Sequence, residues 1–250
     1  MLTHGFSLDG QGRPMSKSMG NGIEPDEINN KYGAEVLRLW VAASDYGSDI
    51  RISQPMLTPH AEGYPKFRNT IKFMLGVLAD FNPATDLVKS GALAFPDQLL
   101  LQQAKSLFME VAGDYARYQF HALYRKLNEF TVLTLSNFYL SLQKDTLYIL
   151  PTNHPRRRSA QSAIFITLRA LIKALAPLLP FTAEEAYALL PEFSGKFASV
   201  HLDDCDAALN LAGGRGARPE DFAAATSYAP PVENRRAAAS SFGEPTTQAA

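Results

Sequence analysis

The chain has 250 residues, enough for one large or two smaller domains, and its 46% hydrophobic content excludes a protein that is disordered throughout. Basic and acidic residues nearly balance at 24 against 25, but residues 101–200 hold 11 against 7, a surplus that permits a polyanionic partner. The single cysteine, Cys205, excludes a disulfide framework and a zinc site built from several cysteines. Without a signal-peptide pattern or an apolar run of about 18–20 residues, a soluble, cytoplasmic protein without a membrane segment is expected.

Residues 1–53 are predicted to hold a short strand, a polar loop and two helices. Residues 4–8 are strand-like, and residues 9–12 are typical of a tight turn because their two glycines adopt positive φ easily. Pro25 with two following carboxylates predicts a helix start, since a fixed φ and negative charge both suit the first turn. Gly33 separates this helix from a second one over 34–43, with an apolar face of Val36, Leu37, Trp40 and Val41.

Residues 54–195 are predicted to form an α-helical bundle. Apolar residues recur there at steps of three and four, so each helix has a face to bury against the others. Pro65 predicts that the first helix starts late or is kinked, and Thr182-Ala183-Glu184-Glu185 resembles a capping box at the start of a short last helix. The apolar stripes lie over 64–78, 100–118, 120–142 and 164–178.

Residues 196–250 are predicted to be a low-complexity, disordered tail. Of the last 45 residues, 27 are Ala, Gly, Pro, Ser or Thr, and the few large apolar residues follow no period. Such a segment cannot bury enough apolar surface to offset its loss of conformational entropy.

The strongest functional signal is the segment 14–21, which reads Pro-Met-Ser-Lys-Ser-Met-Gly-Asn. Lys17 stands between two hydroxyls, Ser16 and Ser18, in a loop flanked by glycines. Such a loop can close around phosphate oxygens, where the lysine would stabilise the charge that a pyrophosphate leaving group gains. The residues alone also allow a plain exposed turn, and the spacing of a Walker loop is absent.

In its context the loop resembles the second signature motif of class I aminoacyl-tRNA synthetases, Lys-Met-Ser-Lys-Ser, at Met15, Ser16, Lys17 and Ser18. Further blocks resemble the isoleucyl-tRNA synthetases of that class, and together they cover about residues 1–192. These blocks follow one another at 31–41, 44–53, 68–70, 136–140 and 144–148.

The resemblance implies a mainly α chain. Residues 1–53 would be the end of a class I catalytic domain, and residues 54–195 a helical anticodon-binding domain. The implied activity of the complete, monomeric enzyme is the activation of isoleucine with ATP and Mg²⁺, followed by transfer to tRNA(Ile). Lys17 would be the catalytic residue and would bind ATP together with Met15, Ser16 and Ser18; no metal site is expected in this chain.

The chain also departs from the family pattern. Pro14 stands where the motif has its first lysine, so one of two cationic groups is missing. The nucleotide-binding sheet, the amino-acid pocket and the editing domain would precede residue 1, which implies that this chain alone binds tRNA without catalysing. The alternatives are a standalone, truncated tRNA-binding module and a fragment of a valyl- or leucyl-type synthetase.

Arg156, Arg157 and Arg158 form the most conspicuous basic cluster. Neighbouring arginines can bind tRNA phosphates and release counterions, although a solvated helix start would look the same. Several aromatic residues could stack on bases, but their place on apolar stripes favours core packing. They are Trp40, Tyr115, Tyr118, Tyr124 and Phe138.

Overall fold

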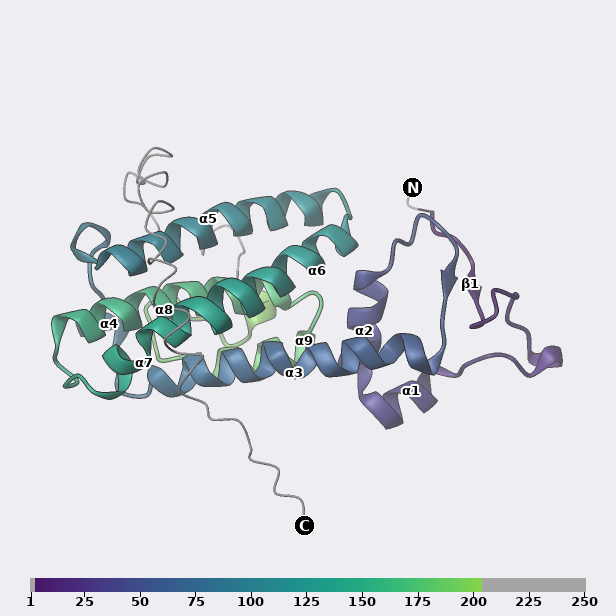
Figure 1. Ribbon diagram of the computed structural model, residues 1–250, viewed down its shortest axis with the longest axis horizontal. Coiled ribbons are helices and arrows are strands. Elements are labelled where there is room, and N and C mark those ends of the chain that lie inside the picture. Colours follow the sequence, from purple (N-terminus) through teal and green to yellow (C-terminus); the bar gives the residue numbers. More distant parts are fainter. Residues whose placement is uncertain (1–2, 204–250) are drawn as a thin grey trace, which may run out of the picture. The chain divides into compact units, whose positions relative to one another are not determined.

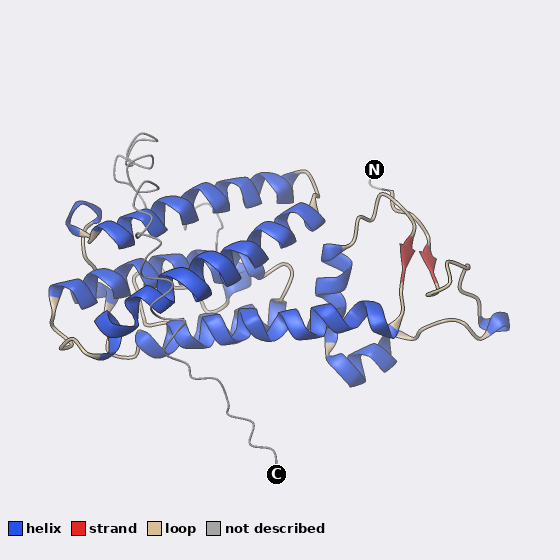
Figure 2. Ribbon diagram, in the orientation of Figure 1, coloured by secondary structure: helices blue, strands red, loops and turns tan. Residues whose placement is uncertain are grey.

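The structure is a computed structural model that describes residues 3–203, and this part of the chain is mainly helical, as the sequence predicts (Figure 1). Two short strands, β1 (Ser7–Leu8) and β2 (Ile50–Arg51), pair in parallel (Figure 2). Ser7 lies opposite Ile50. The elements are β1 (Ser7–Leu8), α1 (Pro25–Tyr32), α2 (Ala34–Ala43), β2 (Ile50–Arg51), α3 (Gln54–Val77), α4 (Pro83–Asp86), α5 (Phe95–Ala116), α6 (Phe120–Glu129), a π-helical segment (Phe130–Leu140), α7 (Ser141–Tyr148), α8 (Pro155–Leu175) and α9 (Pro180–Ala188).

A small N-terminal core holds the first fifty residues together. Ile28 of α1, Trp40 of α2, Ile52 and Leu57 of α3 are all buried in it. Because Leu57 lies in the first turn of α3, this core already includes the start of the long helix.

Helix α2 packs on two sides rather than one. Trp40 faces the N-terminal core, whereas Leu39 and Ala42 join the larger core of the bundle. The predicted apolar face is therefore wrong for Val41, which is 50% exposed. A single stripe cannot describe a helix that lies between two cores.

The predicted bundle of four long helical stretches and one short helix is confirmed. The stretches are α3, α5, the run from α6 through α7, and α8, and α8 packs against α3, α5, α7 and α9. Its predicted stripe from Ile164 to Leu175 is buried, and so are most of its polar side chains. Helix α8 thus lies at the centre of the bundle.

Helix α3 does not start late, and it continues through Pro65. It runs from Gln54 to Val77 with two prolines inside it. Leu57 before Pro65 and Phe67 after it are both fully buried, so packing on either side stabilises one continuous helix despite the missing backbone hydrogen bond.

The stripe predicted over 120–142 is wrong beyond Leu135. Phe138 and Leu142 are 59% and 55% exposed, whereas Tyr139 and Leu140 are buried. The cause is the π-helical segment, because its wider turn needs more residues and moves the buried positions along the sequence.

Two further expectations are corrected near the end of the described chain. Thr182 does not form a capping box: it lies inside the first turn of α9 and bonds to Glu35. Residues 196–203, which the sequence assigns to the tail, pack on the bundle, where Val200 is buried and Asp203 pairs with Lys173. The rest of the predicted tail, 204–250, lies outside the described residues.

Within residues 3–203, no helix has both the length and the apolar character needed to cross a membrane.

Candidate functional site

Asp9 organises the signature loop, residues 9–21, from its base. Its Oδ1 accepts hydrogen bonds from the backbone N–H groups of Arg13 and Gln11 at 2.8 and 2.9 Å. Its Oδ2 accepts from Arg13 Nε at 2.9 Å and Asn21 Nδ2 at 3.0 Å. These donors, the Arg13 N–H first among them, hold the pKa of Asp9 well below its ordinary value. The carboxylate is therefore ionised at neutral pH and fixes the turn.

Asn21 closes the same loop from its far end. Its Oδ1 accepts from the Ser16 N–H at 3.0 Å, and its Nδ2 donates to Asp9 and to the Pro14 carbonyl at 3.1 Å. The side chain therefore joins the start, the middle and the end of the loop.

Lys17 is exposed and begins a short 3₁₀ turn, Lys17–Met19. Ser16 caps this turn, because its Oγ accepts from the Met19 N–H at 3.3 Å, and the Ser16 and Ser18 hydroxyls lie 3.2 Å apart. Gly20 ends the turn with a φ of 62°, which favours glycine. One cation and two hydroxyls thus share a turn whose ends Asp9 and Asn21 hold, an arrangement suited to phosphate oxygens.

Met15 differs from its three neighbours in the motif. It is partly buried and packs against the N-terminal core. Its thioether side chain therefore anchors the loop to the helices behind it.

The three arginines at 156–158 do not act alike. Arg157 donates to Asp80 and to the Leu150 carbonyl, both at 3.0 Å, and Arg158 pairs with Asp80 and Asp86 at 3.3 Å. The charge of these two side chains is thus neutralised inside the protein, whereas Arg156 is exposed.

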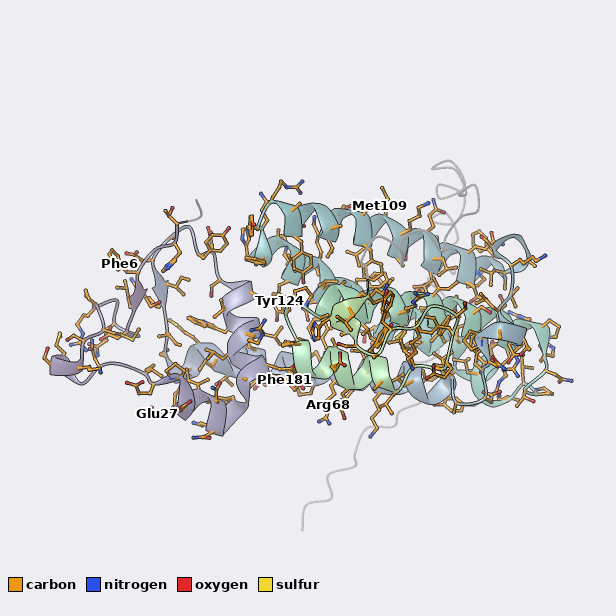
Figure 3. All side chains as sticks on the ribbon, turned by 180° about the vertical axis from the view of Figure 1, so that it is seen from behind. Phe6, Glu27, Arg68, Met109, Tyr124 and Phe181 are labelled. Carbon is orange, nitrogen blue, oxygen red and sulfur yellow. The ribbon has the colours of Figure 1, made fainter. Side chains whose placement is uncertain are left out.

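A different set of cations faces outward from α3. Lys66, Arg68 and Lys72 are exposed, and no ion pair joins any of them to another residue of the described chain. Residues 63–77 of this helix contain no carboxylate. We call these three residues the α3 ridge; Figure 3 labels Arg68 in it.

Two hollows flank the α3 ridge, and both include Asn69. One, of about 430 Å³, is lined by Arg68 and Lys72 together with the α9 residues Thr182 and Glu185. The other, of about 580 Å³, lies between α3 and the π-helical segment, with polar or charged side chains from both walls. Its polar lining is Lys66, Asn69, Thr70, Ser136, Asn137 and Lys144.

The predicted core positions of the aromatic residues are only partly correct. Trp40 is buried and Tyr115 and Tyr124 are half-buried, but Tyr118 and Phe138 are 53% and 59% exposed. Tyr118 has a φ of 58° at the end of α5, where the chain turns back into α6.

Asp9 and the α3 ridge were both missed by the sequence reasoning. The ridge left a signal, because three cations alternate with the buried stripe of α3 in a stretch without acids. The sequence carries no comparable signal for Asp9 beyond its place beside a glycine turn. Its partners Arg13 and Asn21 are recognisable only in the folded loop.

The chain matches two family models in sequence. Residues 97–226 match the anticodon-binding domain of tRNA ligases, and residues 1–53 match class I tRNA synthetases of the I, L, M and V group. The chain belongs to the class I tRNA ligases that carry this anticodon-binding domain.

The similar curated proteins include isoleucine–tRNA ligases of several bacteria. Identity is 46% over 81% of this chain to the enzyme of Geobacter sulfurreducens and 45% over 82% to that of Kosmotoga olearia. For isoleucine–tRNA ligase 1 of Oceanobacillus iheyensis it is 42% over 85%. The chain spans between a fifth and a quarter of their length, 22% of the first two and 23% of the third. These relatives are all named isoleucine–tRNA ligases.

Solved structures show the same fold at low identity. The LeuRS of Agrobacterium radiobacter, in a ternary complex with tRNA and LeuAMS, superposes with a TM-score of 0.60 at 19% identity, over 93% of this chain and 29% of that one. Methionyl-tRNA synthetase of Mycobacterium tuberculosis with methionyl-adenylate gives 0.61 at 20% identity, over 78% of this chain and 39% of that one.

Proposed function

We propose that this chain supplies the ATP-binding signature loop and the tRNA-binding bundle of an isoleucine–tRNA ligase. The supporting observation is the loop in which Asp9 and Asn21 hold Lys17 between two hydroxyls, in a chain whose relatives are isoleucine–tRNA ligases. In the complete enzyme, the isoleucine carboxylate attacks the α-phosphate of ATP and releases pyrophosphate. A ribose hydroxyl at the 3′ end of tRNA(Ile) then takes the aminoacyl group from the adenylate.

Each residue of the loop has a role in this proposal. Lys17 stabilises the negative charge on the β- and γ-phosphates as pyrophosphate leaves. Ser16 and Ser18 donate to phosphate oxygens or hold the closed turn, and Met15 anchors it. Mg²⁺ would accompany ATP in the complete enzyme and neutralise part of the phosphate charge.

The division at residues 53 and 54, into the end of a catalytic domain and an anticodon-binding domain, is part of the same proposal. So are a cytoplasmic location and a monomeric state.

We further propose that the chain by itself does not activate isoleucine, because the residues that would orient isoleucine and ATP are not among its motifs. Isoleucine-dependent pyrophosphate exchange by the purified chain should not exceed that of a Lys17→Ala variant; clear turnover above that variant would overturn this part.

The tRNA-facing surface is proposed to be the α3 ridge together with Arg156. The exposed cations of the α3 ridge make no ion pair in the described chain and are free to replace the counterions of a phosphate, whereas Arg157 and Arg158 already neutralise Asp80. Arg156 is exposed as well. The flanking hollow of about 580 Å³ offers two amides, two hydroxyls and two lysines to an unstacked nucleotide.

The test is the binding of a tRNA(Ile) transcript to the 250-residue chain across a salt series. Replacing Lys66, Arg68 and Lys72 by alanine should lower the slope of log K against log salt by about 2 to 3, since each phosphate contact contributes about 0.7–0.9. A Lys89, Lys105 and Arg125 triple alanine variant removes the same charge from exposed positions outside the ridge and should leave most of the slope. Equal losses in both variants would show that only net charge matters, and no binding at all would overturn the tRNA proposal.

A further inference from the structure

Two charged residues on α2 reach the corner between α8 and α9. Glu35 and Arg38 are three positions apart, so they project from the same face of the helix. Glu35 is only 7% exposed, and its Oε1 accepts from the Thr182 N–H at 2.8 Å. Its Oε2 accepts from the Thr182 hydroxyl, which also lies 2.8 Å from the Tyr64 hydroxyl. Helices α2, α3 and α9 therefore meet at one buried carboxylate.

Glu35 takes the place of a missing cap. The N-cap residue of α9 is Leu179, whose side chain accepts no hydrogen bond, and Thr182 carries one of the first-turn N–H groups that have no partner inside a helix. A carboxylate is also the charge that the N-terminal end of a helix dipole favours. Phe181, labelled in Figure 3, marks this first turn.

Arg38 binds the short linker between α8 and α9. Its guanidinium donates to the Leu178 carbonyl at 2.9 Å through Nε and to the Pro177 carbonyl at 2.6 Å. These carbonyls lie in the linker that follows the end of α8 at Leu175. One face of α2 thus presents a negative charge to the start of α9 and a guanidinium to the linker before it.

The same helix leads back to the signature loop. Trp40 of α2 lies in the N-terminal core, and Met15 packs on that core. Apolar contacts such as those of Leu39 and Ala42 have no preferred direction, whereas the hydrogen bonds that the buried carboxylate accepts and the guanidinium donates are directional and fix the position of α2.

We propose that Glu35 and Arg38 are positioning residues that fix the signature-loop segment on the α8–α9 corner, so that the loop and a tRNA bound to the bundle keep one relative geometry. The statement about bound tRNA rests on the proposed function. The statement that Glu35 and Arg38 fix the loop segment concerns the chain alone and is tested without tRNA.

The test uses spin labels on cysteines at Glu27 in α1 and Met109 in α5, in the full chain with Cys205→Ser. Figure 3 labels both positions, and both side chains are exposed. The labelled chain in which Glu35, Arg38 and Thr182 are unaltered should give one narrow distribution of the distance between the two labels. Glu35→Gln and Arg38→Gln should broaden it, and exchange of the Thr182 N–H should become about tenfold faster on loss of a charged hydrogen bond.

Three further variants separate positioning from general stability. Thr182→Ser keeps both donors and should leave the distribution narrow, whereas Thr182→Val should broaden it. Glu185→Gln is the matched control, an exposed carboxylate on the same helix. Arg38→Gln keeps the test valid if Glu35→Gln fails to fold, because Arg38 lies largely at the surface. Distributions as narrow in the Arg38→Gln and Thr182→Val variants as in the control would overturn the positioning role.

Added tRNA distinguishes the two proposals. It should slow amide exchange over residues 14–21 in the unaltered chain and have a smaller effect in Arg38→Gln, although both bind it equally. If tRNA binds but slows amide exchange over residues 14–21 equally in both proteins, the proposed link between bound tRNA and the loop would be overturned. Absence of binding would overturn the proposed function, while the spin-label distances would still decide the positioning role.

Discussion

At the scale of single residues, Asp97 shows how hydrogen bonds hold a buried carboxylate. It is 1% exposed between α5, the π-helical segment and α8. Its Oδ1 accepts from the Tyr139 hydroxyl at 2.6 Å and from Gln143 Nε2 at 3.0 Å, and its Oδ2 accepts from the Ser159 hydroxyl at 2.5 Å. Burial raises the pKa of Asp97, and the hydrogen bonds from Ser159 and Tyr139 oppose this only in part.

The raised pKa predicts a distinct dependence of stability on pH. Between the ordinary value of 3.8 and the raised value, the folded state holds a proton that the unfolded state has lost, so the contribution of Asp97 falls as pH rises through this window. Asp97→Asn removes the titration. The free energy of unfolding of the unaltered chain minus that of the variant, measured in urea from pH 3.5 upward, should therefore decrease with rising pH. A difference that stays constant or increases would contradict the assignment.

At the scale of elements, the π-helical segment decides which residues reach the core. Leu135 is fully buried, Tyr139 and Leu140 follow it into the core, and Phe138 faces outward. The segment also forms one wall of the larger hollow through Val132, Ser136, Asn137 and Leu140. A regular α-helix over the same residues would present a different set of side chains to α3.

This register gives a matched pair of substitutions. Leu135→Ala should lower the free energy of unfolding by about 2–5 kcal/mol, because it leaves a cavity in a packed core. Phe138→Ala should lower the free energy of unfolding by less than about 1 kcal/mol, since the phenylalanine side chain is already mostly exposed to water. Urea unfolding of both variants measures the difference, and a similarly large loss in both would mean that Phe138 is buried as in a regular α-helix.

At the scale of the whole described chain, Asp203 joins its end to its central helix. The carboxylate pairs with Lys173 at 2.6 Å, and the two side chains are 1% and 2% exposed. It also accepts a hydrogen bond from the Tyr187 hydroxyl at 2.9 Å. Residues 196–203 therefore complete the bundle by neutralising a positive charge inside it.

Asp203→Ala should lower the free energy of unfolding by about 3–5 kcal/mol, because it removes the carboxylate that neutralises a buried ammonium group. Glu192→Ala is the control: its side chain is 87% exposed and pairs with Lys196, so its loss should cost at most about 1 kcal/mol. Thermal or urea unfolding of the two variants compares them. Equal, small effects would mean that residues 196–203 do not contribute to the bundle.

The sequence by itself determined the features that depend on neighbours along the chain. The helix start at Pro25, the break at Gly33 and the buried stripe of α8 follow from backbone preference and helical period, and all were predicted. The signature loop was recognised because its residues are contiguous. These signals are local, so they survive without knowledge of the fold.

Only the tertiary structure decided which charges are neutralised and which side chains of a helix are buried. Arg157 meets Asp80 across 77 positions, and Glu35 meets Thr182 across 147, so no sequence window contains both partners. The polar residues of α8 are buried because other helices surround it, and the stripe beyond Leu135 moved because the helix widened. Long-range pairing and helix geometry are properties of the packed molecule, and for that reason Arg157 and Arg158 pair with Asp80, whereas the cations of the α3 ridge make no ion pair in the described chain.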